Sequence, residues 1–152
     1  MKIEYKNFYS HYVLTCFGRI SLIPDRNRIR IEKYITGIVS KNNARLYAVY
    51  VNPDHTHILV SRNPDIDDEE LLTIIADSSA KFINENKLSV GNFAWQESAS
   101  GFSVSKSDVN RVCKYILNQC EHHKQTTFAE EYDKFLKHYQ DTLNKNLNGE
   151  NK

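Results

Sequence analysis

The chain has few cysteines, no long apolar run and almost no net charge. Its three cysteines are an odd number and include no Cys-x-x-Cys pair, so a disulfide framework is not expected. We expect Cys16, Cys113 and Cys120 to be reduced thiols in a cytoplasmic protein. No stretch approaches the roughly 18 apolar residues of a membrane span, and the N-terminus lacks the apolar segment of a signal peptide. We therefore expect no membrane partner.

The formal net charge of +1 gives no overall attraction to nucleic acid. The charges are unevenly spread, because residues 18–45 hold seven basic side chains and residues 61–86 hold seven acidic ones. The first stretch could bind a polyanion or be a solvated basic loop, whereas the second would repel a polyanion. The candidates for contacts with backbone phosphates are Arg26, Arg28 and Arg30.

Length and apolar periodicity favour one α+β domain over residues 1–152, with a polar tail at 140–152. Strands are expected at 11–17, 45–51, 55–61 and 93–97, and helices around 31–39, 68–86, 106–123 and 128–139. A flexible loop at 98–101 and an extended segment at 102–104 follow the last strand. Ser105 with Asp108, and Thr127 with Glu130, resemble capping boxes. The order β-α-β-β-α-β predicts a ferredoxin-like antiparallel sheet with helices on one face, plus two C-terminal helices.

Two histidines stand at the start of the third expected strand, directly after the turn Asn52-Pro53-Asp54. Because side chains alternate across a strand, His55 and His57 point to one face and Thr56 to the other. Two imidazoles on one face suit a metal site, but they would equally suit a half-exposed hairpin end. A third ligand elsewhere in the chain would decide between the two.

The helix expected at 106–123 carries a second candidate pair. Its apolar stripe consists of Val109, Val112, Cys113, Ile116 and Cys120. Tyr115 and Gln119 lie on the flank of that stripe, one turn apart, so they are neighbours on one face. A tyrosine is a nucleophile for phosphodiesters when a cation shields the phosphate. An amide oxygen can join two imidazole nitrogens around a divalent ion.

Seven segments occur in an order and spacing that we find in one known family. They are Asn52–Val60, Asp77–Asn84, Trp95–Gln96, Phe102–Ser105, Tyr115–His123, Phe128–Tyr132 and Phe135–Leu136. With them the chain resembles, over about residues 9–139, the single-tyrosine HUH transposases of small bacterial insertion sequences. This family is IS200-like and includes the REP-associated tyrosine transposases. The chain departs from the family pattern at Ala76 and at Ser98–Gly101, where DNA contacts could lie.

The resemblance implies a catalytic domain that acts on single-stranded DNA, with hairpin-containing element ends as the expected partner. It implies that His55, His57 and Gln119 are ligands of a divalent metal, Mg²⁺ or Mn²⁺, and that Tyr115 is the nucleophile. Tyr115 would attack a scissile phosphate to form a 5′-phosphotyrosine, and a 3′-OH would then rejoin the strands. A homodimer is also implied.

Two other functions remain open from the residues alone. The first is a catalytically silent, transposase-derived module that only binds nucleic acid. The second is a zinc hydrolase that uses His55, His57 and one of His122 or His123, although no His-Glu-x-x-His motif is present. His122 lies one turn beyond Gln119 and could instead contact phosphate or be a plain surface residue.

Overall fold

The computed structural model describes residues 1–4, 7–122, 127, 129–130, 133–134, 136–137 and 140–141. Contacts within the chain divide it into two compact units, Met1–Leu117 and Asn118–Lys152. The first unit holds the sheet and helices α1 to α3, and the second holds α4 (Gln119–His122). The expectation of one domain over the whole chain stays a prediction.

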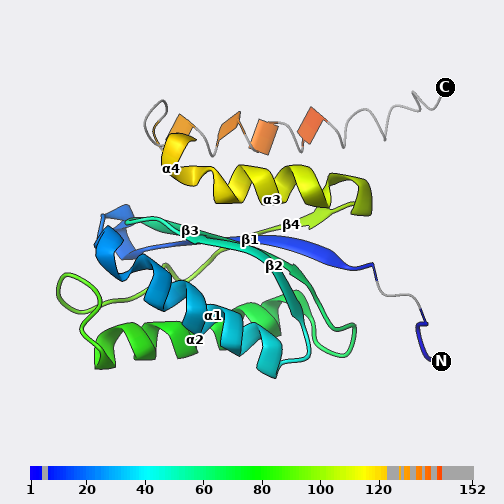
Figure 1. The fold of residues 1–152 in the computed structure, drawn as a ribbon, viewed down its shortest axis with the longest axis horizontal. Coiled ribbons are helices and arrows are strands. Elements are labelled where there is room, and N and C mark those ends of the chain that lie inside the picture. The colour runs from blue at the N-terminus through cyan, green and yellow to red at the C-terminus, as the bar shows by residue number, and fades with distance from the viewer. Residues whose placement is uncertain are drawn as a thin grey trace. The chain divides into compact units, whose positions relative to one another are not determined.

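Among the described residues, four strands form one antiparallel sheet in the order β2-β3-β1-β4 (Figure 1). The strands are β1 (Tyr9–Thr15), β2 (Arg45–Val51), β3 (His55–Ser61) and β4 (Ser100–Val104). The turn between β2 and β3 is closed by the Asn52 N–H, which donates to the His55 carbonyl at 2.8 Å. This order and these directions confirm the predicted ferredoxin-like arrangement.

Helices α1 (Arg28–Lys41) and α2 (Asp68–Glu85) cover one face of the sheet (Figure 1). Their apolar stripes bury Ile31, Ile35, Ile38, Val39, Leu71, Ile75 and Ile83. Asp67 caps α2 by accepting the Glu70 N–H at 2.7 Å. Tyr34 of α1 is partly exposed and stacks on Phe82 of α2, with ring centroids 3.9 Å apart.

Helix α3 (Val109–Leu117) lies on the opposite face of the sheet (Figure 1). A second, smaller core fills the space between them, with buried side chains from the strands and from the helix. Its members are Ala48, Leu59, Val104, Val109, Val112 and Ile116. Because β3 is covered on both faces, every residue from His55 to Val60 is buried. The centre of the sheet is thus closed to water on both sides.

The strand predicted at 93–97 is wrong, because only Trp95 forms a bridge there, to Cys16. The Phe93 N–H donates to Asn84 Oδ1 at 2.8 Å, and the Asn84 amide N–H donates to the Phe93 carbonyl at 2.9 Å. Both backbone groups of Phe93 are therefore used outside the sheet. Trp95 is buried, and its indole N–H donates to Ser79 Oγ at 2.9 Å. The fourth strand starts at Ser100, inside the segment predicted as a flexible loop.

The single helix predicted at 106–123 is also wrong. Residues 106–108 form a 3₁₀ turn, α3 ends at Leu117, and α4 begins after a turn at Asn118. In that turn the Glu121 N–H donates to the Asn118 carbonyl, a three-residue spacing that an α-helix does not use. The box predicted at Ser105 is absent, since its hydroxyl donates to the Asp108 carboxylate and caps no N–H.

The capping box predicted at the fourth helix is confirmed. The Thr127 N–H donates to Glu130 Oε2 at 3.0 Å, and the Glu130 N–H donates to Thr127 Oγ1 at 3.3 Å. The described residues that follow are helical at 129–130, 133–134, 136–137 and 140–141. The remainder of the predicted span 128–139 lies outside the described residues.

None of the three cysteines forms a disulfide, as their number and spacing predict. Across the part of the chain that the structure describes, no helix combines the length and the apolar character needed to cross a membrane.

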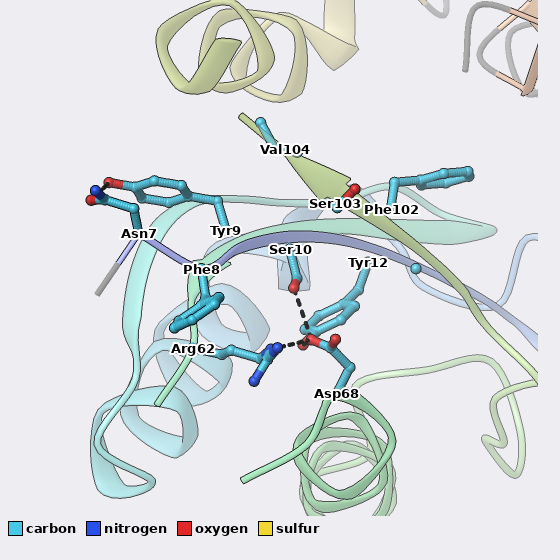
Figure 2. Close-up of a pocket in the computed structure, with 11 residues that line it drawn as sticks. Asn7, Phe8, Tyr9, Ser10, Tyr12, Arg62, Asp68, Phe102, Ser103 and Val104 are labelled. Atoms are coloured by element: carbon cyan, nitrogen blue, oxygen red, sulfur yellow. Dashed lines mark hydrogen bonds and ion pairs between the residues drawn. The ribbon is translucent and has the colours of Figure 1, made fainter. Parts of the chain in front are cut away.

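The Asp68 carboxylate ties the first turn of α2 to the sheet, beside a pocket of about 290 Å³ (Figure 2). Its Oδ1 accepts hydrogen bonds from Ser10 Oγ at 2.8 Å and from the Tyr12 hydroxyl at 2.5 Å. The Arg62 guanidinium lies 3.2 Å from the same oxygen. One carboxylate therefore connects β1, the end of β3 and α2.

Replacing Tyr12 by phenylalanine should weaken this connection. Burial, together with the hydrogen bond to Asp68, raises the pKa of Tyr12 above its ordinary value. The stabilisation is therefore fully present below about pH 10 and is lost as the pH rises further. We expect Tyr12→Phe to lower the free energy of unfolding by about 1.5–3 kcal/mol at pH 7, and by less at pH 11. Urea unfolding at both pH values measures this; a difference that stayed constant would contradict it.

Candidate functional site

His55 and His57 lie side by side on the α3 face of the sheet. In the β1–β3 register His57 pairs with Val13 and His55 pairs with Thr15, while Thr56 faces the opposite core. The two imidazole centroids are 5.0 Å apart and the rings are nearly perpendicular, at 81°. Both side chains are buried. The hairpin therefore presents two imidazoles on one face, as strand alternation predicts.

The His55 ring is held through both of its nitrogens. Its Nδ1 lies 2.6 Å from the Asp54 carboxylate, and its Nε2 lies 3.1 Å from the Asn52 amide nitrogen. Since Asp54 can only accept, the proton belongs on Nδ1, and Nε2 accepts from the amide. The turn residues that close the hairpin thus also fix the orientation and the proton position of His55.

The His57 ring is held by a third histidine, His11 on β1. The His11 Nε2 atom lies 3.0 Å from His57 Nδ1, and the ring centroids are 5.2 Å apart. Burial lowers the pKa of His11 to about 3, so its ring is neutral at pH 7. Sequence reasoning missed His11, although a single histidine in an otherwise apolar buried strand was a usable signal.

Tyr115 lies on α3, which packs on the face of the sheet that carries the two imidazoles. Its ring packs edge-on against His57, with centroids 5.7 Å apart and planes at 89°. The side chain is partly buried at the border of the smaller core. The structure therefore brings together the tyrosine and the histidine pair that the sequence singled out separately.

The other predicted site residues are Gln119, His122 and the three arginines. Gln119 is the first residue of α4 in the second unit, and the His122 side chain lies outside the described part. Arg28 pairs with Glu32 at 2.8 Å and lies over the Tyr50 ring at 4.5 Å. Arg30 donates to Asn86 Oδ1 at 2.7 Å. Arg26 is exposed, in the 3₁₀ turn (residues 25–27) before α1.

The donor set fits a divalent metal in its chemistry. Metal-binding imidazoles characteristically have the second ring nitrogen held by a carboxylate or another acceptor. His55 has this arrangement with Asp54 at Nδ1, and His57 has its Nδ1 at His11. In the described ranges no group of three or more His, Cys, Asp or Glu side chains is arranged to hold an ion. Two imidazoles would therefore need an amide, water or phosphate oxygen as further ligands.

The two departures from the family pattern meet at one place in the fold. Ala76 of α2 and the Ser98–Ala99 pair both line a pocket of about 350 Å³ together with Trp95. Glu69 and Glu97 line it as well, so its rim is acidic. The two sequence differences therefore lie next to the same pocket.

Comparisons with known proteins bear on the fold and the family of the chain. No curated protein matches the chain. A Deinococcus radiodurans R1 protein described as a transposase has a similar structure, with 20% identity and a TM-score of 0.60, over 78% of this chain and 96% of that one. A REP-associated tyrosine transposase bound to a REP hairpin is 14% identical, with a TM-score of 0.56, over 83% of this chain and 74% of that one. At such identities the likeness shows the fold alone.

The family assignment comes from the sequence profile. The family model described as "Transposase IS200 like" matches residues 4–119, well over half of the chain. This chain is a member of the IS200-like transposase family.

Proposed function

We propose that this protein is a transposase that cuts and rejoins single-stranded DNA with Tyr115 as its nucleophile. The observation that carries the proposal is the contact of the Tyr115 ring with His57, 5.7 Å between centroids, beside His55. Membership of the transposase family supports DNA cleavage and joining as the reaction class. A tyrosine and two imidazoles on facing layers supply the groups that such a reaction needs.

In the first step the Tyr115 oxygen attacks the phosphorus of the scissile phosphodiester. The new bond joins that oxygen to phosphorus, and the bond from phosphorus to the 3′-oxygen breaks. The tyrosine proton leaves, and the departing strand gains one to become a free 3′-OH. In the second step a 3′-OH attacks the 5′-phosphotyrosine, which restores a phosphodiester and the tyrosine. One bond of the same type replaces another at each step, so no ATP is required.

We propose that His55 and His57 hold a divalent cation, Mg²⁺ or Mn²⁺, through their ring nitrogens, and Gln119 stays a predicted ligand. When bound, such an ion supplies charge neutralisation at the phosphate. Two hydrogen bonds support this assignment, because they orient both rings: His55 Nδ1–H donates to Asp54, and His57 Nδ1 is joined to His11 Nε2. His55 and His57 then act as positioning groups on a rigid sheet.

The proposed substrate is a single strand with a hairpin at the element end, and the proposed assembly is a homodimer. One protein of similar fold was solved bound to a REP hairpin. We propose that the strand passes the loop after β1, which reaches the turn before His55. In this loop the Cys16 N–H donates to the Asp54 carbonyl at 2.8 Å, and the Phe17 N–H to the Ala94 carbonyl at 2.9 Å.

The loop after β1 exposes the Phe17 ring and the Arg19 guanidinium to solvent. Phe17 is 59% exposed, and Arg19 next to it is exposed as well. Gly18 and Arg19 have positive φ angles of 72° and 56°, so the loop makes a tight turn there. An exposed aromatic ring beside a cation suits a nucleobase and its phosphate. This position supplements Arg26, which remains a proposed phosphate contact.

The first test is formation of a covalent adduct. Purified protein is incubated with labelled single-stranded hairpins from the flanks of its own gene, with Mn²⁺ or with EDTA, and resolved on a denaturing gel. We expect label to migrate with the wild-type protein only in Mn²⁺, and the adduct to disappear in Tyr115→Phe. Tyr47→Phe is the matched control, since Tyr47 borders the same smaller core, and it should keep the adduct.

Retained DNA binding without any adduct would replace this proposal with the catalytically silent binding module. An adduct that survives in Tyr115→Phe would place the nucleophile elsewhere.

The loop after β1 gives a separate prediction about affinity. Loss of one stacked base costs about 1–3 kcal/mol, so Phe17→Ala should weaken single-strand binding by roughly 5–150-fold. Arg19→Ala should reduce the slope of log affinity against log salt by about 0.7. Fluorescence anisotropy across a salt series measures both.

Phe8 and Arg45 provide matched controls at the opposite end of the sheet, where Arg45 pairs with Ser61 and the Arg62 N–H donates to the Phe8 carbonyl. Phe8→Ala and Arg45→Ala should leave affinity and salt slope unchanged. Equal losses at both ends would contradict a strand path over the loop.

A further inference from the structure

His11 is a buried polar ring in a strand that is otherwise suited to apolar packing. It has no exposed surface, and the residues before and after it on the same face are Tyr9 and Val13. Its ring also lies 6.0 Å from that of Phe102 on β4. Burying an imidazole is unfavourable unless its nitrogens are hydrogen-bonded. A leucine would fill the same volume without that cost, so the polar contacts of this ring need a functional explanation.

The partner of His11 is one of the two imidazoles proposed to hold the cation. His11 Nε2 and His57 Nδ1 are 3.0 Å apart, so one proton lies between them. A neutral imidazole carries one proton, on either nitrogen. If that shared proton belongs to His57 Nδ1, then His57 Nε2 has a lone pair and can bind a cation. If it belongs to His11, then His57 Nε2 carries the proton and cannot bind.

The backbone makes this contact rigid. His57 pairs with Val13 and Leu59 pairs with His11 in the antiparallel register of β1 and β3. The two rings therefore project from adjacent central strands, onto one face, at a fixed separation. His55 is fixed in a parallel way by Asp54, which accepts from its Nδ1. Both imidazoles of the pair are thus held at the same ring atom.

We propose that His11 is a positioning residue that keeps the His57 proton on Nδ1 and so presents Nε2 of His57 as the ligand atom. The proposal deepens the proposed function and rests on it for the identity of the ligand. His11 itself touches neither the cation nor DNA in this role. It accepts the His57 proton through Nε2, and its effect reaches the site only through the His57 ring.

The proton position can be measured in metal-free protein. With ¹⁵N-labelled histidine, long-range ¹H–¹⁵N correlation spectra distinguish the two ring tautomers. We expect the His57 signal of the wild-type protein to show the proton on Nδ1. In His11→Leu that preference should be lost, whereas His11→Gln, whose amide oxygen can accept the same proton, should retain it. Val13→Ala is the packing control, because Val13 is buried opposite His57 without donating to its ring.

A second measurement follows Mn²⁺ binding by electron paramagnetic resonance, without DNA. Loss of an outer hydrogen-bond partner typically weakens metal binding 10–100-fold, so His11→Leu should show about that loss. His11→Gln should recover most of it, and Val13→Ala should bind as the wild type does.

A wild-type His57 signal with the proton on Nε2 would overturn the proposal, and this result needs no variant to fold. Equal Mn²⁺ affinity in His11→Leu and wild type would also overturn it. The wild-type protein could bind no Mn²⁺ while the His57 tautomer still responds to His11→Leu as expected. That result would contradict the metal-dependent function but would support the effect of His11 on the His57 proton.

Discussion

The antiparallel pairing of β1 with β3 is the constraint on which the rest of the structure depends. Its register runs from Tyr9 opposite Ser61 to Thr15 opposite His55. A shift of one residue would turn His55 and His57 toward α1 and α2 and expose Thr56 and Ile58 to the other core. Both faces of the pair are buried, so the register is fixed by two separate packing requirements. The pairing of β1 with β3 therefore sets the positions of His55 and His57.

The two faces of the sheet are packed against different helices. The larger core under α1 and α2 holds most of the apolar side chains, and Asp68 anchors α2 to it through Tyr12 and Ser10. The smaller core under α3 places Tyr115 within ring contact of His57. The larger apolar core thus lies on one face, and the three imidazoles and Tyr115 lie on the other. Such a division allows buried imidazoles without weakening the main core.

Sequence patterns identified the parts of the fold that follow from local chemistry. The turn at Asn52–Asp54 and the alternation of His55 and His57 depend only on neighbouring residues, so they could be predicted. The helical stripe of α1 and the capping box at Thr127 are local in the same sense. The contact of Tyr115 with His57 joins distant segments, and only the family resemblance placed the two residues in one site.

Other features depend on partners that a local pattern does not contain. Phe93 and Trp95 alternate as in a strand, but Asn84 binds the backbone of Phe93 and keeps it out of the sheet. The apolar stripe of α3 continues past Asn118, although the backbone turns there. His11 showed no pairing in the sequence, because its partner lies on another strand. For Phe93 and His11, a contact outside the local pattern decided the outcome.

The amide of Asn52 gives the hairpin turn a consequence for ion exchange. His55 Nε2 already accepts a hydrogen bond from this amide, at 3.1 Å. A cation that binds through that nitrogen must first displace the amide, and the displaced N–H then needs water or another acceptor. Occupancy of the proposed ion site would then be a competition between an external ion and an internal donor. Under the proposed function, the Asn52 amide therefore lowers the affinity with which an ion binds at His55.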